Sequence, residues 1–260
     1  MYKTLALGMY SIHKMAKENL LSSFAAMREI GYTGIEFYGE PADFPAEEVN
    51  RAVKEGGLEL TSWHIEWRNL RPETFEETVA YLLRVNCPIA VVPCLGGKWN
   101  VNHAQAEERR GIWDCYVDEL NKLNSTLMKR GLRLGYHNHE HEFILQYDNK
   151  TVFDILFENL DNNVIMEIDT GNCIEGGGDP AAVIKKYSYR DMLLHFKPYS
   201  RAKGFNVTLG DSDDENDWKA ILNAAPEKYL HLILESECEI LPELENVKAC
   251  YKGIKKFVSV

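Results

Sequence analysis

The chain has 260 residues, which is long enough for one large domain and excludes a mini-protein that depends on disulfides or a structural metal. Apolar residues make up 45 % and charged residues 27 %, which is typical of a globular enzyme and not of a disordered or fibrous protein. The formal net charge of −11 repels a phosphate backbone, and no basic patch interrupts it, so we expect no nucleic-acid partner.

The sequence also lacks the marks of a membrane or secreted protein. No run approaches the roughly 20 apolar residues that span a bilayer, so we expect no membrane segment. The first residues, MYKTLALGMYSIHK, have neither the long apolar core nor the cleavage site of a signal peptide, and we expect them to form the first strand. The six cysteines contain no CxxC pair, which favours reduced thiols in the cytoplasm over a disulfide framework.

Short apolar runs alternate with amphipathic stretches along the chain. Runs this short and apolar are typical of strands buried on both faces of a parallel sheet. The eight predicted strands are residues 4–9, 34–37, 58–64, 89–94, 132–137, 164–169, 192–196 and 230–235. The predicted helices are residues 19–30, 74–86, 112–130, 151–159, 180–187 and 242–257, and Gly31 and Gly131 mark the ends of two of them.

Eight strands at a mean spacing of about 32 residues match the rhythm of a (β/α)₈ barrel. A doubly wound sheet is the structural alternative, but the segment after the first strand, GMYSIH, is not a glycine-rich phosphate loop. We therefore predict a single-domain α/β protein, a (β/α)₈ TIM barrel over residues 1–260. The longest segments without periodicity, residues 96–108 and 210–217, are predicted to be active-site loops.

In such a barrel, function collects at the carboxyl ends of the strands. Side chains alternate along a strand, and this alternation places Asp169, His195 and Glu235 on the inward face of three neighbouring strands. Their oxygen and nitrogen atoms suit one divalent metal, namely Mn²⁺, Mg²⁺, Co²⁺ or Zn²⁺. Further acidic, basic and imidazole side chains at these ends are Glu36, His64, Glu66, His137, His139, Glu167, Lys197 and Glu237.

Each member of this set also has a purely structural interpretation. His195 is alternatively a hydrogen-bonded core histidine, and Asp169 alternatively caps the turn that contains Asn172. Glu235 is harder to explain in this way, because a buried carboxylate without a partner is costly. Glu167 is expected one layer deeper, where it pairs with Arg133.

The segment 134–143, LGYHNHEHEF, holds three histidines and two glutamates at the end of a predicted strand. A solvated polar loop is one explanation. The apolar strand before it and the alternation of His137 with His139 instead predict that at least one imidazole enters the barrel mouth.

At these residues the chain resembles the sugar phosphate isomerase/epimerase family of xylose-isomerase-like TIM barrels. The likeness rests on LGYHNHEHEF, EIDTGN followed by GGGDP, HFKPYSR, a Gly-to-DW segment and LILESE, in the family's order over nearly the whole chain. The resemblance implies a metal held by Asp169, His195 and Glu235, and substrate hydroxyls held by Arg201.

The resemblance leaves the first metal ligand open. Ketose 3-epimerases of this family carry a glutamate where this chain has His137, and the nearest glutamate is Glu142. Either side chain completes the metal site. The YHNH form is similar to a branch that includes inosose dehydratases and enzymes acting on 3-keto-glycosides.

Together these features predict a metal-dependent isomerase or epimerase that acts on a small sugar or keto-sugar through an enediolate. The alternatives are a metal-dependent lyase, either inosose dehydratase-like or cleaving 3-keto-glycosides, and a non-catalytic sugar-binding barrel. Proton transfer is assigned to Glu235 on one side and to Glu142, His139 or His137 on the other. The predicted substrate-binding residues are Glu36, His64, Lys197 and Arg201. We further expect a cytoplasmic protein, with a homodimer as its assembly.

Overall fold

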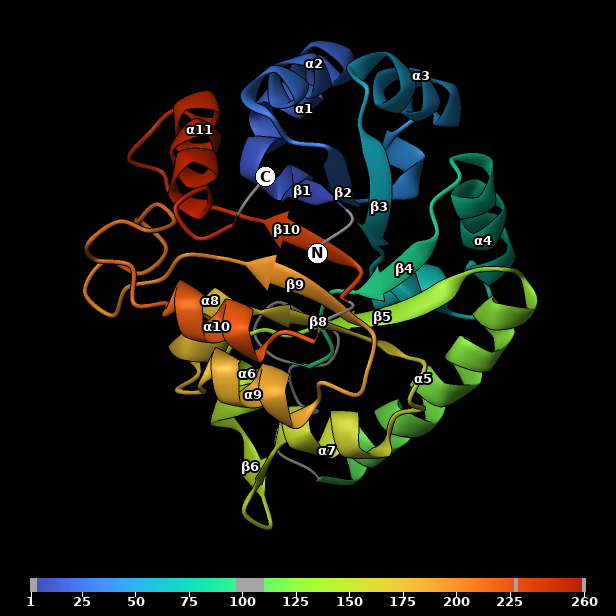
Figure 1. Ribbon diagram of the computed structural model, residues 1–260. Helices are drawn as coiled ribbons and strands as arrows, with labels where there is room; N and C mark the ends of the chain where they lie inside the picture. The colour runs from blue at the N-terminus through green and yellow to red at the C-terminus, as the bar shows by residue number, and fades with distance from the viewer. Residues whose placement is uncertain (1–3, 97–109, 227–228, 259–260) are drawn as a thin grey trace.

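The computed structural model describes residues 4–96, 110–226 and 229–258. Eight parallel strands close into a barrel in the order β1-β10-β9-β8-β5-β4-β3-β2, which confirms the predicted TIM barrel (Figure 1). The strands are β1 Leu5–Gly8, β2 Gly34–Tyr38, β3 Glu59–His64, β4 Ile89–Val92, β5 Arg133–His137, β8 Ile165–Asp169, β9 Met192–Phe196 and β10 His231–Leu234. Each lies within its predicted range or differs from it by one residue.

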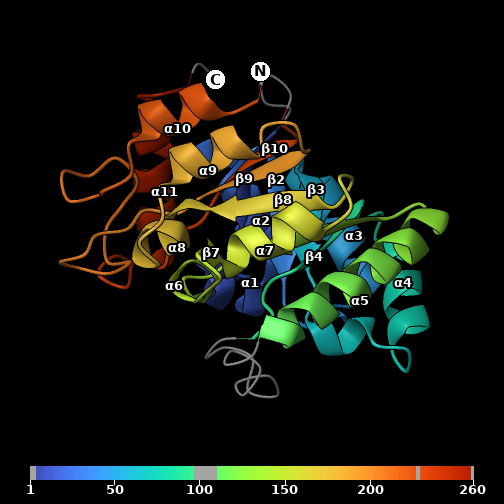
Figure 2. The ribbon, with the colours of Figure 1, turned by 90° about the horizontal axis from the view of Figure 1, so that it is seen from below.

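Helices surround the barrel, and the last of them, α11, lies beside α1 and α2 (Figures 1 and 2). The longer helices are α2 Leu20–Ile30, α3 Ala46–Gly56, α4 Phe75–Arg84, α5 Arg110–Lys129, α7 Val152–Asn159, α9 Pro180–Lys186, α10 Trp218–Ala224 and α11 Glu243–Ile254. The shorter elements are η1 Met9–Ile12, α1 His13–Glu18, η2 Pro41–Asp43, η3 Trp67–Leu70, α6 His141–Ile144, α8 Thr170–Glu175 and a hairpin of β6 Gln146–Tyr147 and β7 Lys150–Thr151.

Local signals explain where the predicted helices begin and end. The Asn19 side chain accepts a hydrogen bond from the Ser22 amide at 2.9 Å and so caps α2, and Gly31 ends the helix at φ 120°. Asp179 caps α9 in the same way, and Pro180 occupies its first position. All six predicted helices are confirmed.

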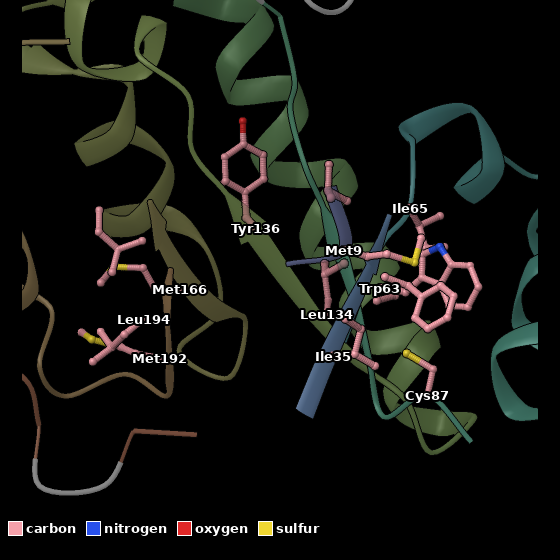
Figure 3. Close-up of a cluster of buried hydrophobic side chains, with 14 of the residues drawn as sticks. Met9, Ile35, Trp63, Ile65, Cys87, Leu134, Tyr136, Met166, Met192 and Leu194 are labelled. Carbon is pink, nitrogen blue, oxygen red and sulfur yellow. The ribbon is translucent and has the colours of Figure 1, made fainter. Parts of the chain in front are cut away.

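Alternation along the strands sorts the side chains into two apolar layers. Ala6, Ile89, Val91, Ile165, Leu193 and Ile233 form a small cluster inside the barrel. Their neighbours along the strands belong to the larger core between barrel and helices, where Figure 3 shows Leu134, Tyr136, Met166, Met192 and Leu194. The small cluster fills the barrel interior below the carboxyl ends, so polar side chains that point inward meet above it.

Of the two predicted active-site loops, only one falls in the described structure. Residues 97–108 of the first loop lie outside the described residues. The second loop, residues 210–217, is described and leads into α10. Among the described residues, no helix combines the length and hydrophobicity needed to cross a membrane.

Candidate active site and metal centre

A group of titratable side chains meets at the carboxyl ends of the barrel strands. The side chains lie in or just after six of the strands, and the strand pairing places them side by side, with His137 opposite Glu167 and Asp169 opposite His195. All are buried or nearly so, although each carries charge or a polar ring. The group consists of Glu36, His64, His137, Glu167, Asp169, His195, Lys197 and Glu235.

His195 lies at the centre of this group, with a carboxylate near each ring nitrogen. Its Nδ1 is 3.3 Å from Oδ2 of Asp169. Its Nε2 is 3.1 Å from Oε1 of Glu36 and 3.7 Å from Oε2 of Glu235. Burial opposes protonation of the ring, but Asp169 and Glu36 outweigh it and raise the pKa of His195.

The two carboxylate oxygens of Asp169 have different roles: one caps a helix and the other faces the site. Oδ1 accepts the Asn172 amide at 2.8 Å and so caps α8, as the structural interpretation expected. Oδ2 faces His195 and makes no hydrogen bond within the described part of the chain. The capping role therefore leaves one oxygen available to a ligand.

His137 approaches the same oxygen from β5. Its Nε2 is 3.8 Å from Asp169 Oδ2, and its Nδ1 is 3.4 Å from Glu167 Oε1. Burial lowers the pKa of His137, and the nearby imidazoles of His64 and His195 add to this effect. The ring is therefore neutral, which is the form in which histidine binds metals.

The ammonium group of Lys197 lies among three carboxylates of the site and its border. Its ammonium is 3.1 Å from Glu235 Oε1, 2.5 Å from Glu237 Oε1 and 3.9 Å from Asp169 Oδ2. Burial alone would favour the neutral amine, but Glu235 and Asp169 outweigh it and raise the pKa of Lys197. The lysine therefore offsets negative charge at the same place where a metal is predicted.

A second set of charged side chains, His64, Glu36 and Glu167, lies beside these residues. His64 Nε2 is 3.1 Å from Glu167 Oε1 and 3.3 Å from Glu36 Oε1. Burial opposes ionisation of Glu36, but His64 and His195 lower its pKa to about 2, and Ser62 donates a hydrogen bond to its Oε2 at 2.5 Å. Burial and the neighbouring Glu36 raise the pKa of Glu167 to about 7. The two carboxylates therefore differ in how readily they ionise.

The structure does not bring Glu142 into this group. Its Oε1 accepts the Tyr136 hydroxyl at 2.7 Å and lies 3.2 Å from His141 Nε2, while its Oε2 accepts the His139 amide at 2.9 Å. Glu142 thus holds the turn after β5 in shape. His139 is half-buried, and its ring centroid lies 5.3 Å from that of His137, so this imidazole borders the group.

Arg201 is also placed apart from the group. Its side chain is 71 % exposed, and its guanidinium pairs with Glu215 at 2.6 Å. Of the four residues predicted to bind substrate, Lys197, Glu36 and His64 lie in the group. Arg201 lies on the surface of the loop that follows β9.

Two features of the site were missed or misplaced from sequence. Glu167 does not pair with Arg133, because its side chain points into the barrel, while Arg133 pairs with Asp191 at 2.6 Å. Its shared parity with Asp169 was the signal that placed it inside. Gly8 was not singled out, yet a Cβ there would come within 3.3 Å of Glu235 Oε2 and 3.5 Å of His195 Nε2.

The donor atoms fit a divalent metal. Asp169 Oδ2 and both ring nitrogens of His195 are buried and make no hydrogen bond within residues 4–96, 110–226 and 229–258. A core histidine held by hydrogen bonds would not leave both nitrogens in this state. Carboxylate oxygen and neutral imidazole are ligands that Mn²⁺, Co²⁺ and Zn²⁺ accept. His64, His137, Glu167 and His195 also offer ligand atoms that all lie within 4.8 Å of one another.

Comparison with known sequences gives a consistent result. A family model described as xylose isomerase-like TIM barrel matches residues 24–255. The inosose dehydratase of Geobacillus kaustophilus is 27 % identical over 186 residues, which cover 66 % of this chain and 59 % of that protein. The match therefore spans less than two thirds of this relative's length. Six further curated relatives carry the same name.

Solved structures share the fold. A sugar phosphate isomerase/epimerase from Parabacteroides distasonis superposes with a TM-score of 0.77 at 17 % identity, covering 98 % of this chain and 99 % of the other. The IOLI protein, whose crystal structure holds a zinc atom, superposes with a TM-score of 0.68 at 14 % identity, covering 99 % and 100 %. At these identities the likeness shows the fold alone.

Proposed function

The chain belongs to the xylose isomerase-like TIM-barrel family, and on this premise we propose that it is a metal-dependent lyase that dehydrates a cyclic keto-sugar of the inosose class. The observation that carries the proposal is the pair of buried groups without hydrogen bonds, Asp169 Oδ2 and His195 Nδ1, at 3.3 Å from each other beside Glu235 and Lys197. The inosose dehydratase names of the curated relatives support the class of substrate.

The proposed metal ligands are Asp169, His195, Glu235 and His137. Of the two alternatives for the fourth ligand, we choose His137 because its Nε2 faces Asp169, whereas Glu142 is engaged by Tyr136 and the His139 amide. When bound, a divalent metal polarises a carbonyl oxygen and so acidifies the neighbouring C–H group. We propose Mn²⁺, Co²⁺ or Zn²⁺ over Mg²⁺, since imidazole is a poor ligand for Mg²⁺.

Glu235 is the proposed base. It is 8 % exposed, whereas Glu36, Glu167 and Asp169 are 2 % exposed or less, so it is the carboxylate of the group that best reaches a substrate. It takes the proton from the carbon beside the carbonyl, and the electrons of that C–H bond form the enediolate. Lys197, 3.1 Å from Glu235 Oε1, holds the carboxylate and donates to a substrate oxygen.

The second half of the reaction needs an acid on the other side of the substrate. His139 follows β5 and Glu235 follows β10, and β8 and β9 lie between those strands in the barrel. Burial lowers the pKa of His139 and keeps its ring neutral, so we propose that this imidazole relays a proton from solvent to the departing hydroxyl group. The C–O bond breaks, water leaves, and the electrons of the enediolate form the new double bond.

An epimerase is the second candidate, because the same base and enediolate serve it and returning the proton to the opposite face inverts the carbon. His137 favours the lyase, since it occupies the position where the resemblance implies a glutamate in ketose 3-epimerases. Arg201 as a substrate ligand, a cytoplasmic location and a homodimer remain predictions.

The test is a substrate screen in deuterated water. Purified protein loaded with Mn²⁺ or Co²⁺ is incubated with inososes and with ketoses, and product mass and solvent deuterium at carbon are measured. The proposal expects an inosose to lose one water, with Glu235→Gln inactive. Deuterium incorporation with inversion and no loss of water would instead establish the epimerase. Bound metal without exchange in any sugar would contradict both and indicate a binding protein.

A further inference from the structure

We propose that the barrel holds a second divalent-metal site beside the first, and that Zn²⁺ is its metal. Its ligands are Glu36 Oε1, His64 Nε2, Glu167 Oε1 and His195 Nε2, hereafter the inner site. The outer site described above holds Asp169, His137 and His195 Nδ1. Its fourth ligand, Glu235, has its Oε2 3.7 Å from His195 Nε2 and so borders both sites. The inner site does not depend on which reaction the protein catalyses.

The spacing of the inner atoms matches the edges of a zinc tetrahedron. Zinc bonds to nitrogen and oxygen of about 2.0–2.1 Å separate tetrahedral ligands by about 3.3–3.4 Å. His64 Nε2 is 3.3 Å from Glu36 Oε1 and 3.1 Å from Glu167 Oε1. His195 Nε2 is 3.1 Å from the same Glu36 atom and 3.7 Å from the same Glu167 atom. Four measured edges therefore fall close to the spacing that zinc requires.

His64 Nε2 and Glu167 Oε1 share a hydrogen bond at 3.1 Å, whereas other atoms of the inner site lie near each other without one. Glu36 Oε1 and His195 Nε2 are 3.1 Å apart, yet both are buried and neither makes a hydrogen bond within the described residues. The second oxygen of Glu167 is buried in the same state. A donor and an acceptor at this distance whose angle does not allow a hydrogen bond do not point at one another. Both can instead point at a common position between them. Such an arrangement suits ligands around an ion.

Neighbouring groups hold the inner ligands in place. Ser62 donates to Glu36 Oε2, which fixes the carboxylate and turns Oε1 toward the two imidazoles. Glu167 lies between His64 and His137, and His137 Nδ1 is 3.4 Å from the same Glu167 oxygen. The inner ligands come from β2, β3, β8 and β9, so closure of the barrel itself assembles them.

His195 is shared by the two sites through its two nitrogens. A neutral imidazole has one nitrogen free to bind a metal, and its other nitrogen carries a proton. Filling both sites at once therefore requires the ring to lose that proton to solvent, so that binding of the second ion releases a proton. The carboxylates around His195 oppose this loss by raising its pKa, so the positive charge of the two ions has to drive it.

Metal content of the full-length protein tests the proposal directly. Protein is saturated with Zn²⁺, freed of excess ion by gel filtration and analysed for zinc per chain. We expect two ions for the wild type, about one for Glu36→Gln and for His64→Ala, and about one for Asp169→Asn. Glu36→Gln preserves the shape of the side chain and serves if His64→Ala does not fold. The control is His13→Gln, since this histidine lies away from the barrel at 38 % exposure, and it should keep two ions.

The possible outcomes separate the inner site from the proposed function. A single ion that is lost in Asp169→Asn and retained in Glu36→Gln and His64→Ala would overturn the inner site and leave the outer site intact. A single ion with the opposite pattern would support the inner site and overturn the outer site, and the proposed reaction with it.

Discussion

Replacing Lys197 by methionine removes the positive charge from the carboxylates at the barrel mouth and keeps most of the side-chain volume. The ammonium is 3.1 Å from Glu235 and 3.9 Å from Asp169, and both are buried. Deleting one partner of a buried ion pair typically costs about 3–5 kcal/mol, because the other charge stays buried without compensation. Glu237, the third partner, is 33 % exposed and water screens it, so we expect a loss of about 3 kcal/mol.

For a chain of this size, that loss lowers Tm by roughly 6–12 °C, at about 2–4 °C per kcal/mol. Calorimetry of metal-free protein measures it. A divalent metal replaces the missing positive charge, so added Zn²⁺ should raise the Tm of Lys197→Met by more than that of the wild type.

The matched control is Lys203→Met. This ammonium pairs with Asp213 on the surface, and both side chains are about half exposed. Water screens the pair, so we expect little change in stability. Equal Tm changes in the two lysine variants would refute the reasoning. So would the same gain in Tm from Zn²⁺ in Lys197→Met and in wild type.

Three further predictions concern the proposed base Glu235, the space beside it at Gly8, and the buried Arg190 at the end of α7. Glu235→Gln should keep most of its bound metal, while turnover falls by about 10²-fold or more. Metal analysis and initial rates measure the two quantities, and near-normal turnover would show that Glu235 is not the base. Gly8→Ala should weaken metal affinity several-fold, because the new methyl group crowds Glu235 and His195. A metal titration at unchanged secondary structure measures this, and an unchanged affinity would contradict the proposed position of the metal. Arg190→Met should lower the free energy of unfolding, measured in urea, by about 3–5 kcal/mol. The buried guanidinium donates hydrogen bonds to three carbonyls at the end of α7 and just beyond it. A loss of less than about 1 kcal/mol would contradict this structural role of Arg190.

The elements of the fold were readable from sequence because barrel strands are buried on both sides. Such strands appear as short apolar runs, and all eight runs became strands. α3 escaped prediction because it carries few large apolar residues, with Val49 and Val53 among charged neighbours. Such a helix is stabilised mainly by its tertiary packing, which helix propensity does not report.

The sequence by itself also determined which residues face the mouth. Parity along a strand is a local property, so it placed Asp169, His195 and Glu235 on the inward face before any contact was known. It could not determine which atoms meet. The register between β8 and β9 brings Asp169 to Nδ1 of His195, whereas closure of the barrel brings Glu36 to Nε2 from a distant part of the chain.

Only the tertiary structure decided how the charges are shared. Lys197 and Arg201 lie in one motif four residues apart, yet one ammonium is buried among carboxylates and the other side chain is a surface partner of Glu215. Glu36 and His64 were predicted to bind substrate, and barrel closure places both beside Glu167 and His195. Spacing along the chain sets the direction of each side chain, whereas the depth at which it lies and the charge it meets are set by strands that pair from distant parts of the chain.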